Sequence, residues 1–116
     1  MLPAEDRIRA QHMLDASRKA QRLIVGRERG DLIADEQLSL SLQRLIEIIG
    51  EAANKVSGET RLQAADIKWA AITGMRNRLI HAYFDVNLDI LWDTVTDDLP
   101  QLIASLESLL KIELPD

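Results

Sequence analysis

The sequence of 116 residues contains no cysteine and only two histidines. Without cysteine, the chain can form neither a disulfide nor a thiolate metal site, and it has no cysteine nucleophile. Any metal site would have to depend on carboxylates. The sequence therefore indicates no metal and no cofactor.

Long hydrophobic runs are also missing. No apolar segment approaches the roughly 20 residues that a helix needs to span a bilayer. The first ten residues lack the apolar stretch of a secretory signal. We therefore expect a cytoplasmic protein that does not enter a membrane.

Aromatic residues make up only 3% of the chain, and no segment alternates clearly between polar and apolar residues. Leu, Ala, Ile, Glu, Asp and Arg dominate instead, which favours an all-α fold. The length suffices for one hydrophobic core and not for two. Residues 1–116 are therefore expected to form a single domain.

Negative charge prevails, with a formal net charge of −5. An acidic protein is poorly suited to non-specific nucleic-acid binding, which depends on neutralising phosphates. The charge is uneven, however. Residues 59–83 carry four Lys or Arg against two Asp or Glu, whereas residues 84–116 carry one against eight. A local anion site is therefore expected within residues 59–83.

The spacing of apolar residues predicts four helical stretches joined by short connections. They cover about residues 3–27, 35–56, 67–81 and 87–112. Long helices with short connections favour an antiparallel helical bundle of four to five helices.

Individual residues predict where these stretches end or bend. Ser57–Ala65 contains Gly58 and several polar residues, so a loop is expected there. Asp66 is expected to cap the third stretch. Pro100 has no N–H and its ring clashes one turn back, which predicts either a kink near Thr96–Pro100 or two helices end to end.

The second stretch has apolar residues on more than one face. Leu40 and Ile48 lie off its main stripe, and in so small a domain an additional apolar face indicates a partner subunit. We therefore expect a homodimer. Gly50 lies in the middle of this stretch at a cost of about 1 kcal/mol relative to alanine. A close helix crossing is the simplest interpretation.

Motifs of several enzyme classes are absent. The chain has no phosphate-binding GxxxxGK[ST], no HExxH zinc motif and no nucleophile elbow. Asp89, Asp93 and Asp97 recur every four residues, which is compatible with a cation-binding edge but is more typical of a solvated helix face.

Side chains suited to catalysis gather in one short segment. It contains, in order, Arg76, Asn77, Arg78, His81 and the only tyrosine, Tyr83. An imidazole is a base near neutral pH, and a guanidinium group matches the shape of a phosphate. Such a set could cleave RNA without a metal. The imidazole would take the 2′-hydroxyl proton or protonate the leaving oxygen, and the guanidinium would stabilise the phosphate.

Spacing alone is weak evidence, because Arg7 and His12 have the same separation as Arg76 and His81 and are expected to be structural. On a continuous helix, Arg76 and His81 would point roughly 140° apart, whereas Asn77 and His81 would share a face. Arg76 and His81 could meet at one phosphate if the helix ended near His81, or if a second protomer contributed across a two-fold axis.

A structural interpretation of these residues is also open. His81 and Asn77 could cap the third stretch, and the two arginines could pair with Asp85 and Glu51.

Three separated parts of the sequence resemble the HepT-like toxins of the HEPN superfamily. Arg76–Tyr83 resembles that family's Arg-x4-His-x-Tyr signature, and Ile48–Ala53 resembles its second-helix motif. The third part comprises Trp69, Gly74–Arg76, Asp89–Trp92 and Asp98–Pro100. The resemblance is good over about residues 36–113 and loose over the first helix.

The resemblance implies an all-α, HEPN-like homodimer with a composite cleft between its subunits. It also implies a metal-independent endoribonuclease that acts as the toxin of a toxin–antitoxin pair. Arg76 and His81 match the family's catalytic pair, Asn77 its polar positioning residue and Tyr83 its tyrosine. Glu51 lies in the second-helix motif, where either orienting an arginine or packing would explain it.

The implied partner is a nucleotidyltransferase antitoxin, MntA, which silences such toxins by transferring AMP from ATP to the tyrosine. Each AMP would add negative charge and bulk beside the site, so that an RNA phosphate is repelled and blocked. The dimer and this antitoxin could also build a larger hetero-oligomer.

Two other functions are compatible with the sequence. In the first, the dimer is a non-catalytic binding module that docks the nucleotidyltransferase and is modified on Tyr83. In the second, the protein is a purely structural helical dimer with a coincidental polar cluster, and substitution of His81 would then have no effect.

Overall fold

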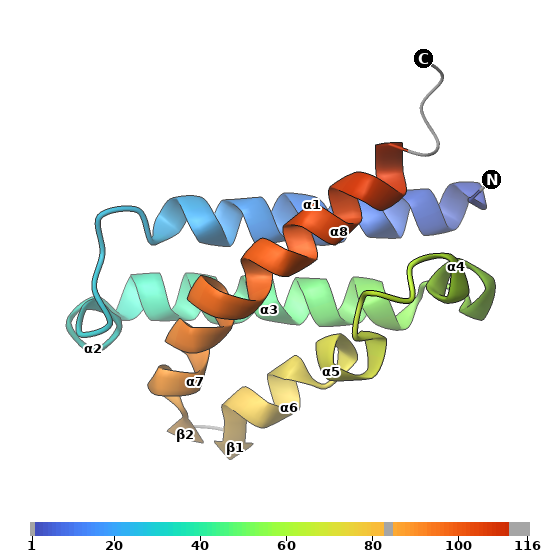
Figure 1. Cartoon of the computed structure of the whole chain (residues 1–116). Coiled ribbons are helices and arrows are strands. Elements are labelled where there is room, and N and C mark those ends of the chain that lie inside the picture. The colour runs from blue at the N-terminus through green and yellow to red at the C-terminus, as the bar shows by residue number, and fades with distance from the viewer. Residues whose placement is uncertain (1, 83–84, 112–116) are drawn as a thin grey trace.

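The computed structural model describes residues 2–82 and 85–111, with the backbone alone described for residues 80–82 and 85. Helices dominate this part of the chain, as expected (Figure 1). In order, the elements are α1 (Ala4–Leu23), α2 (Asp31–Ala34), α3 (Glu36–Asn54), α4 (Gly58–Gln63), α5 (Trp69–Thr73), α6 (Met75–Leu79), β1 (Ile80–Ala82), β2 (Asp85–Val86), α7 (Leu88–Asp93), the π-helix η1 (Thr94–Asp98) and α8 (Leu99–Lys111).

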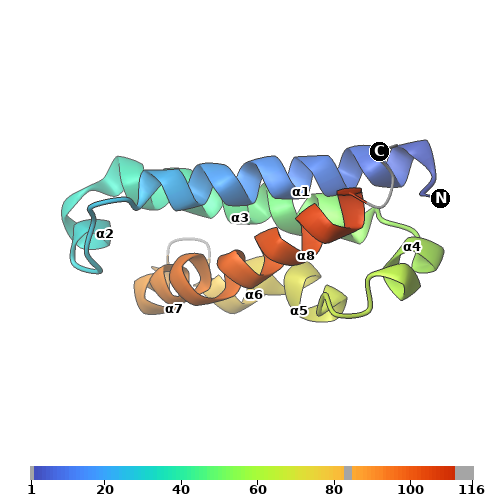
Figure 2. The ribbon, with the colours of Figure 1, turned by 45° about the horizontal axis from the view of Figure 1, so that its top comes forward.

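The elements form two layers. Helices α1 and α3 run antiparallel side by side, and α5–α6 and α7–α8 lie against them (Figures 1 and 2). The principal dimensions are 45 × 29 × 19 Å. The smallest of these corresponds to two layers of helices, which pack about 8–10 Å apart. In the described residues, no helix combines the length and the hydrophobicity that crossing a bilayer requires.

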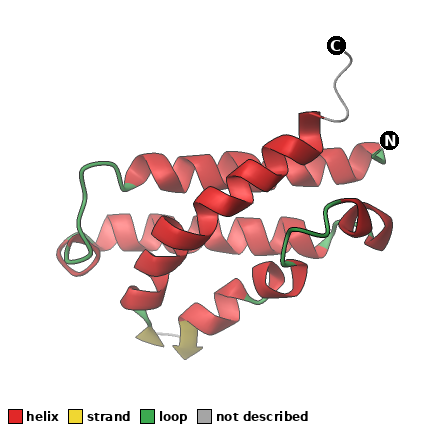
Figure 3. Cartoon of the chain, viewed as in Figure 1, coloured by secondary structure: helices red, strands yellow, loops and turns green. Residues whose placement is uncertain are grey.

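One short hairpin departs from the expected purely helical structure. Strands β1 and β2 pair antiparallel, with Ile80 opposite Val86 and Ala82 opposite Asp85 (Figure 3). The Asn87 N–H donates to the carbonyl of Leu79 at 2.8 Å, so the residues just before β1 and just after β2 are also hydrogen-bonded to each other. The hairpin ends α6 and starts α7, and it therefore determines where His81 lies.

Helix α3 begins at Glu36 because the carboxylate of Asp35 accepts the N–H of Leu38 at 3.1 Å. It packs against α1 on one side and against α5–α6 on the other, which explains its apolar residues on more than one face. Ile48 is partly buried against the core of its own chain. Leu40 is 54% exposed, so it alone of the two off-stripe residues presents a free apolar surface.

The close helix crossing expected at Gly50 is confirmed. A Cβ atom built there would lie 3.5 Å from the carbonyl oxygen of Ile72 and 3.7 Å from that of Thr73. The absence of a side chain thus lets α5 approach the backbone of α3.

We expect Gly50→Ala to raise the free energy of unfolding by about 0.5–1 kcal/mol, because the added methyl group makes ordinary contacts and removes backbone freedom from the unfolded chain. Gly50→Val should instead lower it by about 1–3 kcal/mol, since its branches press on the α5 carbonyls. Urea unfolding followed by circular dichroism measures both changes. Equal destabilisation by both variants would contradict this account of the crossing.

Two expectations for residues 57–73 are wrong. The segment expected as a loop forms α4, because Ser57 accepts the N–H of Thr60 at 3.4 Å and caps the helix. Asp66 caps no helix; its carboxylate accepts a hydrogen bond from Ser105 at 2.5 Å and so joins this segment to α8. The third stretch is also interrupted, because α5 and α6 are separated at Gly74.

Asp6 joins the start of α1 to α4. It is 4% exposed, and its carboxylate accepts hydrogen bonds from the Ser57 N–H (3.1 Å), the Ser57 hydroxyl (2.5 Å) and the Thr60 hydroxyl (2.5 Å). Burial tends to raise the pKa of Asp6, but the hydrogen bonds from Ser57 and Thr60 outweigh it and lower the pKa below its usual 3.8. The ionised carboxylate therefore stabilises the fold.

The C-terminal stretch is continuous through Pro100, with a π-helical turn in front of the proline. The Leu99 N–H bonds to the carbonyl of Thr94, five residues back. The next such bond would need an N–H from Pro100, which has none. The Val95 carbonyl is instead bonded by the side-chain amide of Gln21 on α1. The expected irregularity is thus a π-helical turn rather than a break into two separate helices.

Candidate active site

Arg76 and Asn77 lie on α6 and line the same hollow. The hollow has a volume of about 410 Å³ and lies between α6 and the C-terminal half of α3. The part of α3 that lines it comprises Glu47, Gly50, Glu51 and Asn54.

The guanidinium group of Arg76 forms an ion pair with one carboxylate, that of Glu47. Its Nε lies 3.4 Å from Oε1 of Glu47, and the side chain is 53% exposed. Glu47 also pairs with Arg44 at 3.2 Å, and Glu51 lies 3.8 Å from the same Arg44 nitrogen. Because Glu47 engages Nε, the terminal nitrogens of Arg76 are available to an anion in the hollow.

Glu47 was missed by the sequence analysis, which singled out Glu51. The signal was present, because Arg44, Glu47 and Glu51 follow one another at steps of three and four and so share one face of α3. The structure pairs Glu51 with Arg44 and pairs Glu47 with Arg76. Glu47, and not Glu51, is therefore the carboxylate that pairs with the site arginine.

The backbone of His81 lies in β1, beyond the end of α6 at Leu79. Arg76 and His81 are thus not on one continuous helix, and the roughly 140° separation of a helix does not apply to them. The helical face that Asn77 and His81 were expected to share does not form, for the same reason. Tyr83 lies outside the described residues.

The expected structural pairings of the two arginines are only partly tested. Arg76 pairs with Glu47, and Arg78 donates to the backbone carbonyl of Ala71 at 3.3 Å. Neither arginine pairs with Glu51 in the described part of the chain. The side chain of Asp85 lies outside the description.

The acidic edge of α7 is a solvated face on which one arginine pairs with two carboxylates. Arg29 lies 3.0 Å from Asp89 and 2.6 Å from Asp93, and both carboxylates are more than half exposed. The hydrogen bonds to Asp93 and then Asp89 raise the pKa of Arg29. Among the side chains of residues 2–79 and 86–111, no three His, Asp or Glu gather as metal ligands do.

Arg7 and His12, which repeat the spacing of the candidate pair, are both exposed on α1. They line neither of the two cavities described in this structure. Their surroundings differ from those of Arg76, which faces a hollow and is held by a carboxylate.

Glu47→Ala is expected to lower kcat for the reaction at this site about tenfold, because Arg76 loses its fixed orientation. KM should change less, since removal of a carboxylate also favours binding of an anionic substrate. The fold should be almost unaffected, because exposed ion pairs contribute only about 0–1 kcal/mol. Steady-state kinetics would test this, with Glu51→Ala as the control that leaves the Arg76 contact intact. If Glu47 had only a structural role, the Glu47→Ala substitution would lower thermal stability and leave kcat unchanged.

Comparison with known proteins shows which family this chain belongs to. The family described as ribonuclease HepT-like matches residues 13–109 of this chain. A protein of Caldanaerobacter subterraneus subsp. tengcongensis named "Putative RNase" is 37% identical over 83 residues, which are 72% of this chain and 74% of that protein. A protein of Thermococcus cleftensis named "Probable ribonuclease HepT" is 37% identical over 81 residues, 70% of this chain and 74% of that protein. No solved structure matches this chain.

Proposed function

Because this chain belongs to the HepT-like ribonuclease family, we propose that it is a metal-independent endoribonuclease and the toxin of a toxin–antitoxin pair. The family match over residues 13–109 is the observation that carries the proposal. The arrangement around Arg76 supports it, since a half-exposed guanidinium group that is fixed by Glu47 faces a hollow.

The proposed reaction assigns a role to each of three side chains. His81 acts as the general acid or base on the 2′-hydroxyl and the leaving 5′-oxygen. Arg76 binds the scissile phosphate and stabilises the charge that builds on it, and Asn77 positions the phosphate by hydrogen bonding. The 2′-oxygen forms a new bond to phosphorus as the bond to the 5′-oxygen breaks, and the proton from the 2′-hydroxyl balances the one gained by the leaving oxygen.

We propose that two protomers form the active enzyme. A two-fold axis would bring a second copy of this polar segment close to the first and make a composite cleft. The exposed apolar surface at Leu40 supports the existence of a partner surface. Native mass spectrometry of the purified protein would give the oligomeric state directly.

The proposed regulator is a nucleotidyltransferase antitoxin that transfers AMP from ATP to Tyr83 and releases pyrophosphate. Tyr83 follows His81 by two residues, so the added phosphate would lie in the same short segment as the catalytic imidazole. Its negative charge would repel the RNA backbone.

Cleavage of RNA by purified protein in the presence of EDTA tests the enzymatic proposal. We expect wild-type protein to cut RNA and the Arg76→Ala variant to cut it far more slowly. If both cut equally, the activity belongs to a contaminant and the assignment fails.

A second candidate is a non-catalytic module that binds the nucleotidyltransferase and is modified by it. The net charge of −5 and the two carboxylates beside Arg76 favour it, because both weaken RNA binding. Mass spectrometry after incubation with the nucleotidyltransferase and ATP should show AMP on Tyr83 under both proposals. Modification by AMP without any RNA cleavage by the unmodified protein would favour the module.

A further inference from the structure

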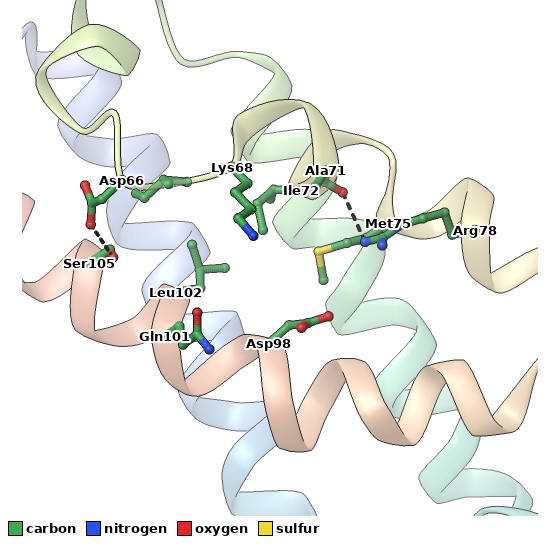
Figure 4. Close-up of a pocket in the computed structure, with 11 residues that line it drawn as sticks. Asp66, Lys68, Ala71, Ile72, Met75, Arg78, Asp98, Gln101, Leu102 and Ser105 are labelled. Atoms are coloured by element: carbon green, nitrogen blue, oxygen red, sulfur yellow. Dashed lines mark hydrogen bonds between the residues drawn. The ribbon is translucent and has the colours of Figure 1, made fainter.

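A second cavity lies on the other side of α5–α6, against α8. It has a volume of about 460 Å³ and is the larger of the two described here. Ile72, Met75 and Leu102 give it an apolar lining (Figure 4). At one end of the cavity, the hydrogen bond from Ser105 to Asp66 connects α8 to the segment before α5.

The polar groups of this cavity come from both of its walls. Lys68 and Arg78 lie on the α5–α6 side together with Asp66, whose carboxylate is bonded by Ser105, whereas Asp98 and Gln101 lie on the η1–α8 side (Figure 4). In the part of the chain that the structure describes, Lys68 and Asp98 make no ion pair and no side-chain hydrogen bond. Arg78 uses one nitrogen on the Ala71 carbonyl and keeps its other donors. A ligand that satisfies both walls needs an anionic group and a hydrogen-bond donor.

This cavity and the Arg76 hollow flank the same short helix. Arg76 and Arg78 are two residues apart on α6, so their side chains leave the helix roughly 200° apart. Arg76 faces the hollow beside α3, and Arg78 faces the cavity beside α8. A single strand that crosses α6 could therefore contact both.

We propose that this cavity binds one nucleotide of the RNA that flanks the scissile phosphate. This inference rests on the ribonuclease function proposed above. A phosphate of the strand contacts Lys68 and Arg78, and the base lies against the apolar lining with its edge toward Asp98 and Gln101. Proteins recognise single-stranded RNA by taking up an unstacked base and forming hydrogen bonds to its edge. Here Ile72, Met75 and Leu102 take the place of the aromatic side chains on which such bases usually stack.

The carboxylate of Asp98 makes the site selective among bases. An ionised carboxylate only accepts hydrogen bonds, so it suits the exocyclic amino group of cytosine, which only donates. Uracil carries a carbonyl oxygen at the same position, and its one edge donor, N3–H, lies beside that oxygen. A carboxylate placed against the amino group of cytosine would therefore meet a second acceptor in uracil. Cytosine and uracil have nearly the same shape, so a difference between them reports on this hydrogen bond.

Binding of short oligonucleotides tests the proposal. Full-length protein with His81→Ala is used so that RNA is not cut, and its fold is checked by circular dichroism. Fluorescence anisotropy with labelled tetracytidylate and tetrauridylate should show about tenfold tighter binding of the cytidylate, as one good base contact provides. Asp98→Asn should reduce this preference to less than twofold, because an amide can donate to uracil. Lys68→Gln should weaken the binding of both oligonucleotides by a similar factor, because Lys68 contacts a phosphate that both of them carry.

Two matched variants control for charge alone. Asp97→Asn and Lys55→Gln change exposed residues that do not line the cavity, and they should leave the preference unchanged. An equal affinity for both oligonucleotides, or a preference that survives Asp98→Asn, would overturn the proposal.

The same experiment separates this inference from the proposed function. If wild-type protein cuts no RNA but the Asp98-dependent preference is present, the nucleotide site stands and the ribonuclease proposal falls. If wild-type protein cuts RNA and Asp98→Asn does not change the preference, the nucleotide site falls and the ribonuclease proposal stands.

Discussion

Replacing His81 by alanine is expected to slow RNA cleavage by about 10²–10⁴-fold, the usual contribution of a general acid or base. The imidazole is the group in the proposed site that exchanges protons near neutral pH. Its backbone lies in β1, immediately after the helix that carries Arg76.

The chain supplies its own control for this experiment. His12 follows Arg7 at the same spacing, and both are exposed on α1. His12→Ala should leave cleavage within twofold of wild type. If His81→Ala and His12→Ala have equal rates, the polar segment has no catalytic role and the structural interpretation is correct.

Replacing Asp6 by alanine is expected to lower the free energy of unfolding by about 3 kcal/mol. The carboxylate accepts three hydrogen bonds from Ser57 and Thr60, and hydrogen bonds to an ionised group contribute about 1.5–3 kcal/mol each. The loss is smaller than their sum because Ser57, which is partly exposed, can bond to water instead. Thr60 is fully buried, so its hydroxyl would lose the acceptor of its proton without gaining water. In a domain of this size the melting temperature should fall by about 10–15 °C.

The contribution of Asp6 should depend on pH in a defined direction. Its pKa is lower in the folded protein than the usual 3.8, so folding favours the ionised form. The stabilisation is fully present above about pH 4 and is lost as the pH falls through the lower, folded-state pKa. Melting curves of wild type and Asp6→Ala should therefore converge at acidic pH. Asp15→Asn, on the exposed face of α1, is the matched control and should behave like wild type. A constant difference between pH 2 and pH 7 would contradict this role.

Periodicity in the sequence was sufficient to predict the long helices. The apolar steps of α3 and of the α7–α8 stretch are regular, and their burial follows from them. Residues whose partners are distant in the sequence were not predictable in this way. Asp66 looked like a helix cap and instead bonds to Ser105, 39 residues away. The start of α4 could have been predicted, because serine is a favoured N-cap residue. Gly58, which is typical of loops, favoured the wrong interpretation.

The candidate site was predicted to a similar degree. Arg76 and Asn77 came from local composition, and the structure places both on one hollow. The carboxylate that holds Arg76 belongs to α3, 29 residues earlier, and only the fold brings it there. The end of the third helical stretch near His81 was expected to within two residues, whereas the short hairpin that follows it was not, because no alternation of polar and apolar residues signals strands there.

The hydrogen bond from the Gln21 side chain to the Val95 carbonyl links the first helix to the C-terminal helical stretch. The bend ahead of Pro100 leaves a main-chain acceptor that the C-terminal segment has no means of satisfying by itself. In an isolated peptide of residues 87–111 this carbonyl would bond to water, whereas in the folded protein α1 supplies its donor. The first and last helices therefore complete one another's hydrogen bonding although 74 residues separate the two partners.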